Sequence, residues 1–298
     1  MSQAWVGPSQ SEVGRARRAQ LRIARLYFVT DDATPEESLP ALIRDVVAGG
    51  VEMVQLRRKG VDVAELAELA RECRTICHDQ GALFLIDDHV ELAAAVGADG
   101  VHIGQTDLGP IEARAQLGAD ALIGLSTHSS EQVLRAANQP VDYLSAGPVH
   151  ATPTKPGRPA VGFEHVTAAA MRSNLPVVAI GGLGRGTAAA AVSAGADIVA
   201  VVRALSQAPD PKTVAQDLKA ELEAARSWVR LQVNGEERKC PPGASVLDFL
   251  ERVGVAQDGI VIERNGEILR AVDLGKTELT SGDELELVHL VGGGKDDG

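Results

Sequence analysis

Charged and polar side chains follow several short apolar runs of this sequence, at positions where they could bind an anionic substrate. The first group lies at the end of the second run or after the second, third and fourth runs: Gln55, Arg57, Lys59, Asp87, Asp88 and Asp107. The like charges of the three aspartates would repel one another if nothing lay between them. Mg²⁺ binds through one or two carboxylates together with substrate phosphates. The cluster therefore indicates a site for a Mg²⁺-bound diphosphate.

A second group of polar residues follows the later apolar runs. Ser126 follows the fifth run, the loop after the sixth carries Thr152, Thr154 and Lys155, and a glycine-rich stretch at 181–186 follows the seventh. Such a stretch can bind phosphate through backbone N–H groups, although alone it is about as often a plain turn. Taken singly, each charged residue has an ordinary explanation as a solvated charge or a helix cap. Their convergence favours two anionic groups, a diphosphate and a monophosphate, and indicates a transfer in which diphosphate leaves.

The apolar runs that carry these residues recur eight times between residues 25 and 227. They are 26–30, 51–57, 83–86, 100–103, 121–125, 142–146, 176–180 and 198–202. Nearly continuous apolar runs are typical of parallel strands buried on both faces, and the intervening segments have helical spacing. This α/β alternation predicts a (β/α)8 TIM barrel, with an open doubly wound sheet as the alternative. The carboxyl ends of barrel strands meet at one mouth, where the polar residues would converge.

The pattern changes after Trp228. Two strands joined by Asn234-Gly235 are followed by a short helix at 245–253, a strand at 260–264 and a last strand at 284–291. Asn-Gly is a strong hairpin signal, and Ser245 is a suitable helix N-cap. This order predicts a small β-grasp (ubiquitin-like) α+β domain.

The chain is therefore expected to comprise four parts. They are an N-terminal extension at 1–24, which is floppy or helical, a barrel at 25–227, a β-grasp domain at 228–294 and a tail at 295–298 after a diglycine.

Composition excludes several classes of protein. The net charge of −12 argues against bulk binding to nucleic acid, so an anionic substrate must be held by local groups. The chain has neither an apolar stretch long enough to span a membrane nor an apolar segment behind residues 15–22, and we expect a cytoplasmic protein. Its three cysteines are too few for a disulfide framework, and Cys73 and Cys77 are expected to be buried thiols rather than metal ligands.

The barrel segment resembles thiamine phosphate synthase. The motifs that carry the resemblance lie between residues 26 and 205: Q-L-R-x-K, D-D, G-V-H-I-G-Q-x-D-L, G-x-S-T-H, T-x-T-K and V-A-I-G-G. Members of that family join hydroxymethylpyrimidine diphosphate to a thiazole phosphate and release diphosphate. Related thiazole tautomerases share the barrel but typically lack the full set of diphosphate-binding residues, so a tautomerase is the alternative.

The resemblance implies a role for each residue of the site. Arg57, Lys59 and Lys155 would hold the diphosphate, while Asp88 and Asp107 would bind Mg²⁺. The remaining roles fall to Gln55 and Ser126 on the pyrimidine, Thr152 and Thr154 over the reacting centre, and Gly181 and Gly182 on the thiazole phosphate. Ser126, Thr152 and Lys155 would be the catalytic residues. An aminopyrimidine can bear the cation left by diphosphate, so no strong base and no catalytic histidine is expected.

Two positions depart from the family. Asp87 stands where asparagine is usual, so it is either a further Mg²⁺ contact or a charge that weakens diphosphate binding. Arg203 stands where serine is common and could strengthen the grip on a phosphate.

The C-terminal domain is similar to the sulfur carrier protein of thiazole biosynthesis. The similarity rests on V-N-G-E, on S-G-D-E-L-E-L and on a diglycine at Gly293-Gly294. It implies a thiocarboxylate on Gly294, with a ThiF-type adenylating enzyme and a thiazole synthase as partners. Lys295 follows Gly294 and blocks that carboxylate, so either a protease removes 295–298 or the domain is only a docking module.

Overall fold

The computed structural model divides the chain into two compact units, residues 1–225 and 226–298. It describes residues 11–152, 159–225, 228–256 and 259–289. The two units are considered separately below.

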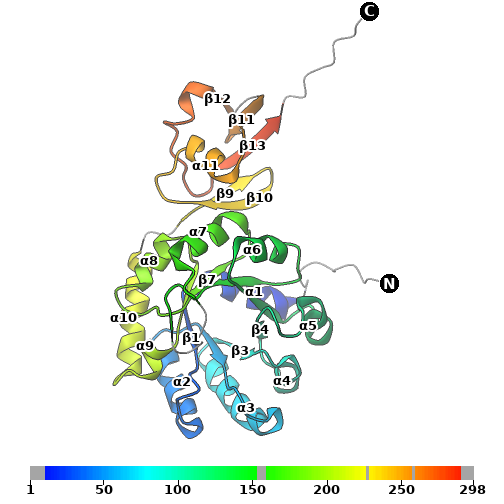
Figure 1. The fold of residues 1–298 in the computed structure, drawn as a ribbon, viewed down its shortest axis with the longest axis vertical. Coiled ribbons are helices and arrows are strands. Elements are labelled where there is room, and N and C mark those ends of the chain that lie inside the picture. The colour runs from blue at the N-terminus through cyan, green and yellow to red at the C-terminus, as the bar shows by residue number, and fades with distance from the viewer. Residues whose placement is uncertain (1–10, 153–158, 226–227, 257–258, 290–298) are drawn as a thin grey trace, which may run out of the picture. The chain divides into compact units, whose positions relative to one another are not determined.

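The first unit is a closed barrel of eight parallel strands in sequential order, with helices around it (Figure 1). The strands are β1 (Leu26–Val29), β2 (Met53–Leu56), β3 (Leu83–Asp87), β4 (Gly100–Ile103), β5 (Leu122–Thr127), β6 (Tyr143–Ala146), β7 (Val177–Ile180) and β8 (Ile198–Val201). Pairing of β1 with both β2 and β8 closes the circle. The predicted TIM barrel is confirmed, and the open sheet is excluded.

Amphipathic helices cover the outside of the barrel. They are α2 (Leu39–Ala48), α3 (Val63–Asp79), α4 (Val90–Val96), α5 (Pro110–Leu117), α6 (Ser130–Ala136), α7 (Gly162–Arg172), α8 (Ala188–Ser193), α9 (Arg203–Ser206) and α10 (Pro211–Ala224), with a short 3-10 turn η1 (Glu36–Ser38) before α2. Asp62 caps α3 by accepting a hydrogen bond from the backbone N–H of Ala64. The buried face of α3 includes Cys73 and Cys77. Burial raises the pKa of the Cys73 thiol to about 12, so both cysteines serve as core residues.

Each strand turns alternate side chains into the barrel, and the inward set divides into two zones. Toward the amino ends of the strands the interior is apolar, with Met53, Leu83, Leu122 and Ile198 in one buried cluster. Toward the carboxyl ends the inward side chains are polar on β2 to β6, as at Gln55, and apolar on β7 and β8, as at Ile180. The apolar zone fills the barrel, so a cavity can form only at the carboxyl end.

The N-terminal extension forms a helix, α1 (Glu12–Ile23), that lies across the amino end of the barrel. Leu21 is buried in the same cluster as the inward side chains of the strands. Arg17 pairs with Asp99 at 2.8 Å, and Arg18 pairs with Asp142 at 2.7 Å. Of the two states expected for the extension, the helical one is observed.

A carboxylate stands directly before every even-numbered strand. These residues are Glu52, Asp99, Asp142 and Asp197. Each accepts a hydrogen bond from a backbone N–H at the start of the preceding odd-numbered strand, namely that of Leu26, Phe84, Ile123 or Val177, at 2.8–3.2 Å. The strands are thus tied in pairs by side chains as well as by the sheet.

The second unit is a five-stranded sheet with one helix packed on it. Its strands are β9 (Val229–Val233), β10 (Glu236–Cys240), β11 (Ile260–Arg264), β12 (Glu267–Leu269) and β13 (Glu284–His289), in the spatial order β10-β9-β13-β11-β12. A 3-10 turn η2 (Ala271–Asp273) precedes the last strand, and α11 (Val246–Val253) begins with a capping box between Ser245 and Asp248. Asn234 and Asn265 each have positive φ at their Asn-Gly turns. The predicted β-grasp domain is confirmed.

Within the part of the chain that the structure describes, no helix is both long enough and apolar enough to cross a membrane.

The ion pairs under α1 yield a prediction about stability. Asp142 accepts from Arg18, Arg114 and the backbone of Ile123, and its side chain is only 8% exposed. Replacing Asp142 with alanine leaves two cations without their partner, so the free energy of barrel unfolding should fall by about 3 kcal/mol in urea titration. The control is Arg135→Ala, which removes an exposed pair with Glu131 and should cost less than about 0.5 kcal/mol. Equal losses would contradict a structural role for the pairing.

Candidate functional site

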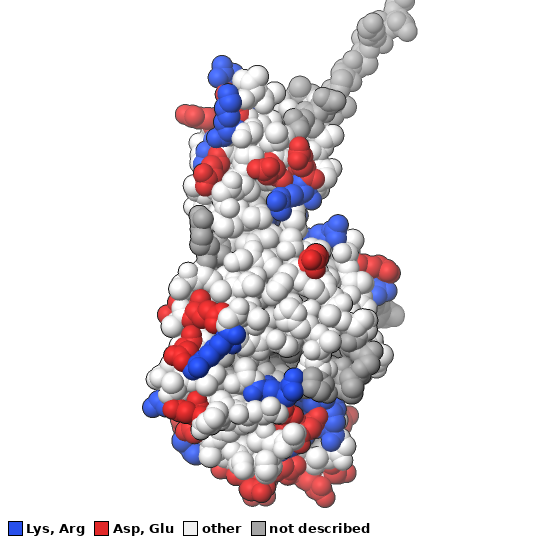
Figure 2. All heavy atoms as spheres, turned by 60° about the vertical axis from the view of Figure 1, so that its left-hand side comes forward, with Lys and Arg blue, Asp and Glu red and all other residues white. Residues whose placement is uncertain are grey.

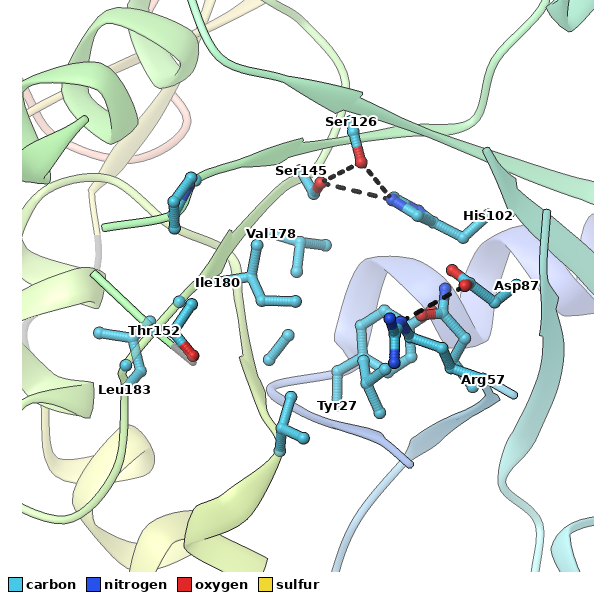
Figure 3. A pocket seen from close by; sticks show the side chains of 18 of the residues that line it. Tyr27, Arg57, Asp87, His102, Ser126, Ser145, Thr152, Val178, Ile180 and Leu183 are labelled. Carbon is cyan, nitrogen blue, oxygen red and sulfur yellow. Dashed lines mark hydrogen bonds and ion pairs between the residues drawn. The ribbon is translucent and has the colours of Figure 1, made fainter. Parts of the chain in front are cut away.

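A cavity of about 180 Å³ opens at the carboxyl ends of the barrel strands (Figure 3). One wall is polar and comes from β2 to β6, whereas the opposite wall is apolar and comes from β7 and β8. The polar wall consists of Gln55, Arg57, Asp87, His102, Ser126 and Ser145, and the apolar wall includes Val178, Ile180, Leu183, Ala200 and Val202. A flat ring system fits such a slot, with polar groups on one edge.

Arg57 is a buried cation on the polar wall. Its backbone is fixed by Thr30, whose hydroxyl accepts from the Arg57 N–H at 2.8 Å and donates to the Arg57 carbonyl at 3.0 Å. The guanidinium pairs with Asp32, and its Nε lies 3.6 Å from Asp87. That distance allows ionic attraction but no hydrogen bond, so Nε is a buried donor without a hydrogen-bond acceptor among the described residues. A buried donor of this kind is suited to an anionic ligand in the cavity.

Lys59 and three carboxylates form a charged cluster at the rim of the cavity. Lys59 pairs with Asp88 and lies 3.3 Å from Asp87. Burial alone would lower the pKa of Lys59, but the hydrogen bond and charge of Asp88 and the charge of Asp87 raise it overall, so Lys59 remains a cation. Burial and the neighbouring Asp88 raise the pKa of Asp107, against a hydrogen bond from the Gly104 N–H at 2.8 Å.

The backbone of Asp88 places its carboxylate next to Asp107. Asp88 has a φ of 60°, in the left-handed region that most side chains avoid, and its N–H donates to the His102 carbonyl at 2.8 Å. Backbone strain of this kind is concentrated at functional sites.

The donor set fits Mg²⁺ held partly by a substrate. Asp88 and Asp107 offer hard carboxylate oxygens from the loops that follow two neighbouring strands, β3 and β4. The described residues contain no cluster of three or more histidine, cysteine or carboxylate ligands that would form a closed metal cage. Two carboxylates with substrate phosphates completing the shell is the usual arrangement for Mg²⁺.

A buried histidine that was not among the predicted site residues lies in the polar wall. His102 Nε2 lies 2.9 Å from the Ser126 hydroxyl, and Nδ1 lies 3.0 Å from the Tyr143 hydroxyl. The expectation that no histidine is catalytic stays a prediction. The signal for its position was present, because His102 alternates in β4 with Val101 and Ile103, which face the helices, and therefore had to face the interior.

The glycine-rich loop after β7 closes the far end of the cavity. Gly181 has a φ of 111°, and a Cβ there would lie 2.5 Å from the Cα of Pro148. Gly182, with a φ of 66°, approaches His150 in the same way. The glycines let this loop pack directly on the loop after β6. Beside them Arg203 begins α9, where the first backbone N–H groups have no acceptor within the helix.

The structure brings most of the predicted site residues together. Those that line the one cavity are Gln55, Arg57, Asp87, Ser126, Thr152, Gly181, Gly182 and Arg203. Lys59, Asp88 and Asp107 form the adjoining cluster at the rim. Thr154, Lys155, Gly293 and Gly294 lie outside the described residues.

The face of the described residues drawn in Figure 2 has no broad basic patch. On the side drawn in Figure 2, basic and acidic side chains lie next to one another rather than in one broad basic field. With a net charge of −12, binding of an anion depends on the cavity itself.

Comparison with known proteins assigns a family to each unit. The model of the family described as "Thiamine monophosphate synthase" matches residues 26–205, and that of the ThiS family matches residues 231–294. Two curated relatives, both named thiamine-phosphate synthase, are 43% identical over 210 residues, or 70% of this chain. The match covers 99% of the relative from Acidothermus cellulolyticus but only 59% of the longer one from Nostoc sp..

A solved structure supports the same assignment. Thiamine phosphate pyrophosphorylase from Pyrococcus furiosus is 32% identical and superposes with a TM-score of 0.63. The match covers 68% of this chain and 98% of that protein.

The glycine loop yields a second prediction. Gly181→Ala combines an unfavourable φ with a backbone clash, so it should destabilise the barrel by about 2–4 kcal/mol in urea unfolding. Gly81→Ala is the matched control, because Gly81 follows the end of α3 with a φ of 76° but has open space around it, and should cost only about 1 kcal/mol. Equal losses would mean that the two loops separate freely and that contact with Pro148 does not shape the site.

Proposed function

The chain belongs to the thiamine monophosphate synthase family, and we propose that it condenses hydroxymethylpyrimidine diphosphate with a thiazole phosphate to give thiamine monophosphate and diphosphate. The C–O bond to the diphosphate breaks, and the electron pair leaves with that group. The lone pair of the thiazole nitrogen then forms the new C–N bond to the exocyclic carbon of the pyrimidine. The observation that carries the proposal is Arg57, a buried cation that lines the cavity and whose Nε has no hydrogen-bond acceptor among the described residues.

Arg57 and Lys59 bind the leaving diphosphate. Charge builds up on the diphosphate as the bond breaks, and cations that are already in place stabilise it without reorganising. The paired carboxylates Asp32 and Asp88 hold the two cations in position. Lys155, from the loop after β6, is proposed as a third cation on the strength of its T-x-T-K motif.

Asp88 and Asp107 would hold Mg²⁺, which when bound supplies positive charge to the diphosphate oxygens. Asp87 contacts both Arg57 and Lys59 in the rim cluster, within 3.6 Å and 3.3 Å. These contacts support a role for Asp87 in orienting the two cations, in addition to any contact with the metal.

The pyrimidine is proposed to lie in the slot between the two walls. Gln55 and Ser126 are buried on the polar wall and can bond to the polar edge of the ring. Val178 and Ile180 cover the opposite side and exclude water from the cation that forms. Thr152, with Thr154 from the same motif, is proposed to lie over the reacting carbon.

The thiazole phosphate is proposed to bind at the glycine end of the cavity. Gly181, Gly182 and the first turn of α9 supply backbone N–H groups there, and Arg203 adds a positive charge. This end is separate from the rim cluster, so the two anionic groups occupy different sites.

The second unit is proposed to act as a sulfur carrier for thiazole formation. Its match to the ThiS family extends to residue 294, and its fold is that of a carrier. Adenylation by a ThiF-type enzyme and sulfur transfer to a thiazole synthase require a free carboxylate on Gly294, so we propose cleavage of the Gly294–Lys295 bond. A docking module without cleavage is the alternative.

The diphosphate site is tested by replacing Arg57 with alanine. Release of diphosphate from the pyrimidine substrate should fall by about 100-fold or more, because a preorganised charge at the leaving group is lost. Arg44→Ala removes an exposed arginine on α2 and should leave the rate unchanged. Circular dichroism verifies that both variants fold. An Arg57→Ala enzyme with normal turnover would refute the proposed role.

The carrier role is tested by the mass of the protein isolated from its own host during thiamine synthesis. A chain ending at Gly294, in part about 16 Da heavier from sulfur replacing oxygen, is expected from the thiocarboxylate chemistry. A chain that still continues past Gly294 under these conditions would favour the docking module.

A further inference from the structure

A chain of hydrogen bonds runs through the interior of the barrel to the floor of the cavity. The hydroxyls of Tyr27 and Tyr143 lie 3.1 Å apart, and Tyr143 lies 3.0 Å from His102 Nδ1. The chain continues from His102 Nε2 to Ser126 at 2.9 Å, with the Ser145 hydroxyl 3.5 Å from that of Ser126. All of these side chains are buried, and Figure 3 shows Ser126 and Ser145 beside His102 at the cavity wall.

The barrel makes room for this chain at one position. A Cβ on Gly124 would lie 2.1 Å from Cζ of Tyr143 and 2.5 Å from Nδ1 of His102. The two rings are stacked, with centroids 5.5 Å apart and planes at 26°. Tyr143 therefore crosses the interior only because residue 124 has no side chain, and its hydroxyl is fixed against His102.

The direction of these hydrogen bonds is set by Tyr27, the residue at the other end of the hydrogen-bond chain from Ser126. Burial raises the pKa of both phenols, so each keeps its proton. The bond to Tyr143 is the one hydrogen bond of the Tyr27 hydroxyl within the described ranges, so Tyr27 would leave its proton unused unless it donates to Tyr143. Tyr143 must then donate to His102 Nδ1. This fixes the proton of the neutral imidazole on Nε2, where it donates to Ser126.

We propose that Tyr143, to which Tyr27 donates, is a positioning residue that makes Ser126 a hydrogen-bond donor toward the cavity. Ser126 accepts from His102 and Ser145, so its own proton is directed to the substrate. A serine set in this way selects an acceptor, such as a ring nitrogen, and disfavours a donor such as an amino group. This specificity rests on the proposed function, since it assigns Ser126 to a ring nitrogen of the pyrimidine.

The direction is measured in the free protein, without substrate. In the full chain labelled with ¹⁵N-histidine, long-range ¹H–¹⁵N correlation reports the tautomer of His102, assigned with His102→Gln. The expected result is the Nε2–H tautomer in the wild type and a mixture in Tyr143→Phe, where Nδ1 has lost the hydroxyl that donates to it. An Nδ1–H tautomer in the wild-type protein would mean that these hydrogen bonds run in the opposite direction, and it would overturn the proposal.

The specificity is measured with two deaza analogues of the pyrimidine diphosphate, each with one ring nitrogen replaced by C–H. For the analogue that lacks the nitrogen bound by Ser126, kcat/KM in the wild type should be about 3- to 10-fold lower than for the natural substrate, which is the value of one hydrogen bond. In Tyr143→Phe the same replacement should cost less, while the other analogue behaves alike in both enzymes. Identical discrimination in the wild type and Tyr143→Phe would overturn the proposal.

A matched control separates positioning from simple loss of stability. Thr167→Val removes another partly buried hydroxyl bond, to the Ala194 carbonyl at 3.0 Å, away from the cavity. It should lower stability without changing the His102 tautomer or the response to the analogues. An inactive wild type would refute the proposed synthase reaction, whereas the tautomer measurement would still decide the direction of the chain.

Discussion

The interior of a closed eight-stranded barrel holds few side chains, and this limit governs the rest of the first unit. Alternation along each strand decides which residues face inward. Apolar residues such as Met53 and Leu122 fill the amino end, and Leu21 of α1 is buried with them. Space for a ligand is left only at the carboxyl end, where inward residues such as Gln55 and Ser126 are polar. The position of the site therefore follows from packing before any chemistry is considered.

Charge is distributed along the same axis. At the amino end, carboxylates such as Asp99 and Asp142 are fully engaged by arginines and backbone N–H groups, so they contribute to stability. At the carboxyl end the pairing within the described part of the chain is incomplete, because a buried donor of Arg57 has no acceptor there and Asp107 lies beside Asp88. Incomplete pairing costs stability in the free protein and is compensated when an anion and a cation bind. The two ends of one barrel thus use the same residue types for opposite purposes.

Much of this could be predicted from sequence, because strand ends in a parallel barrel meet at one mouth whatever the loops do. Each barrel strand coincides with one of the eight apolar runs, except that β3 and β5 extend one and two residues past theirs, and Arg57, Asp87 and Ser126 at these strand ends do line one cavity. The hydrogen-bond chain from Tyr27 could not be read in this way, since its members lie on four strands and depend on space at Gly124. The packing of α1 was equally hidden, because the partners of Arg17 and Arg18 are 82 and 124 residues away. Local patterns reveal elements and faces, whereas contacts across the barrel need coordinates.

The carboxylates before the even-numbered strands divide the barrel into four clamped quarters. Glu52 ties the start of β1 to that of β2, and Asp99, Asp142 and Asp197 do the same for the following pairs. No clamp joins one quarter to the next in this series, and all of them lie at the end of the barrel away from the cavity. The turns that lead into odd-numbered strands therefore lie between clamped pairs, and we call them seams. They are the turns at 80–82, 118–121 and 173–176. A circular permutation opened at a seam would keep every quarter and the ligand cavity intact, whereas one opened at residues 49–52 would cut through a clamp.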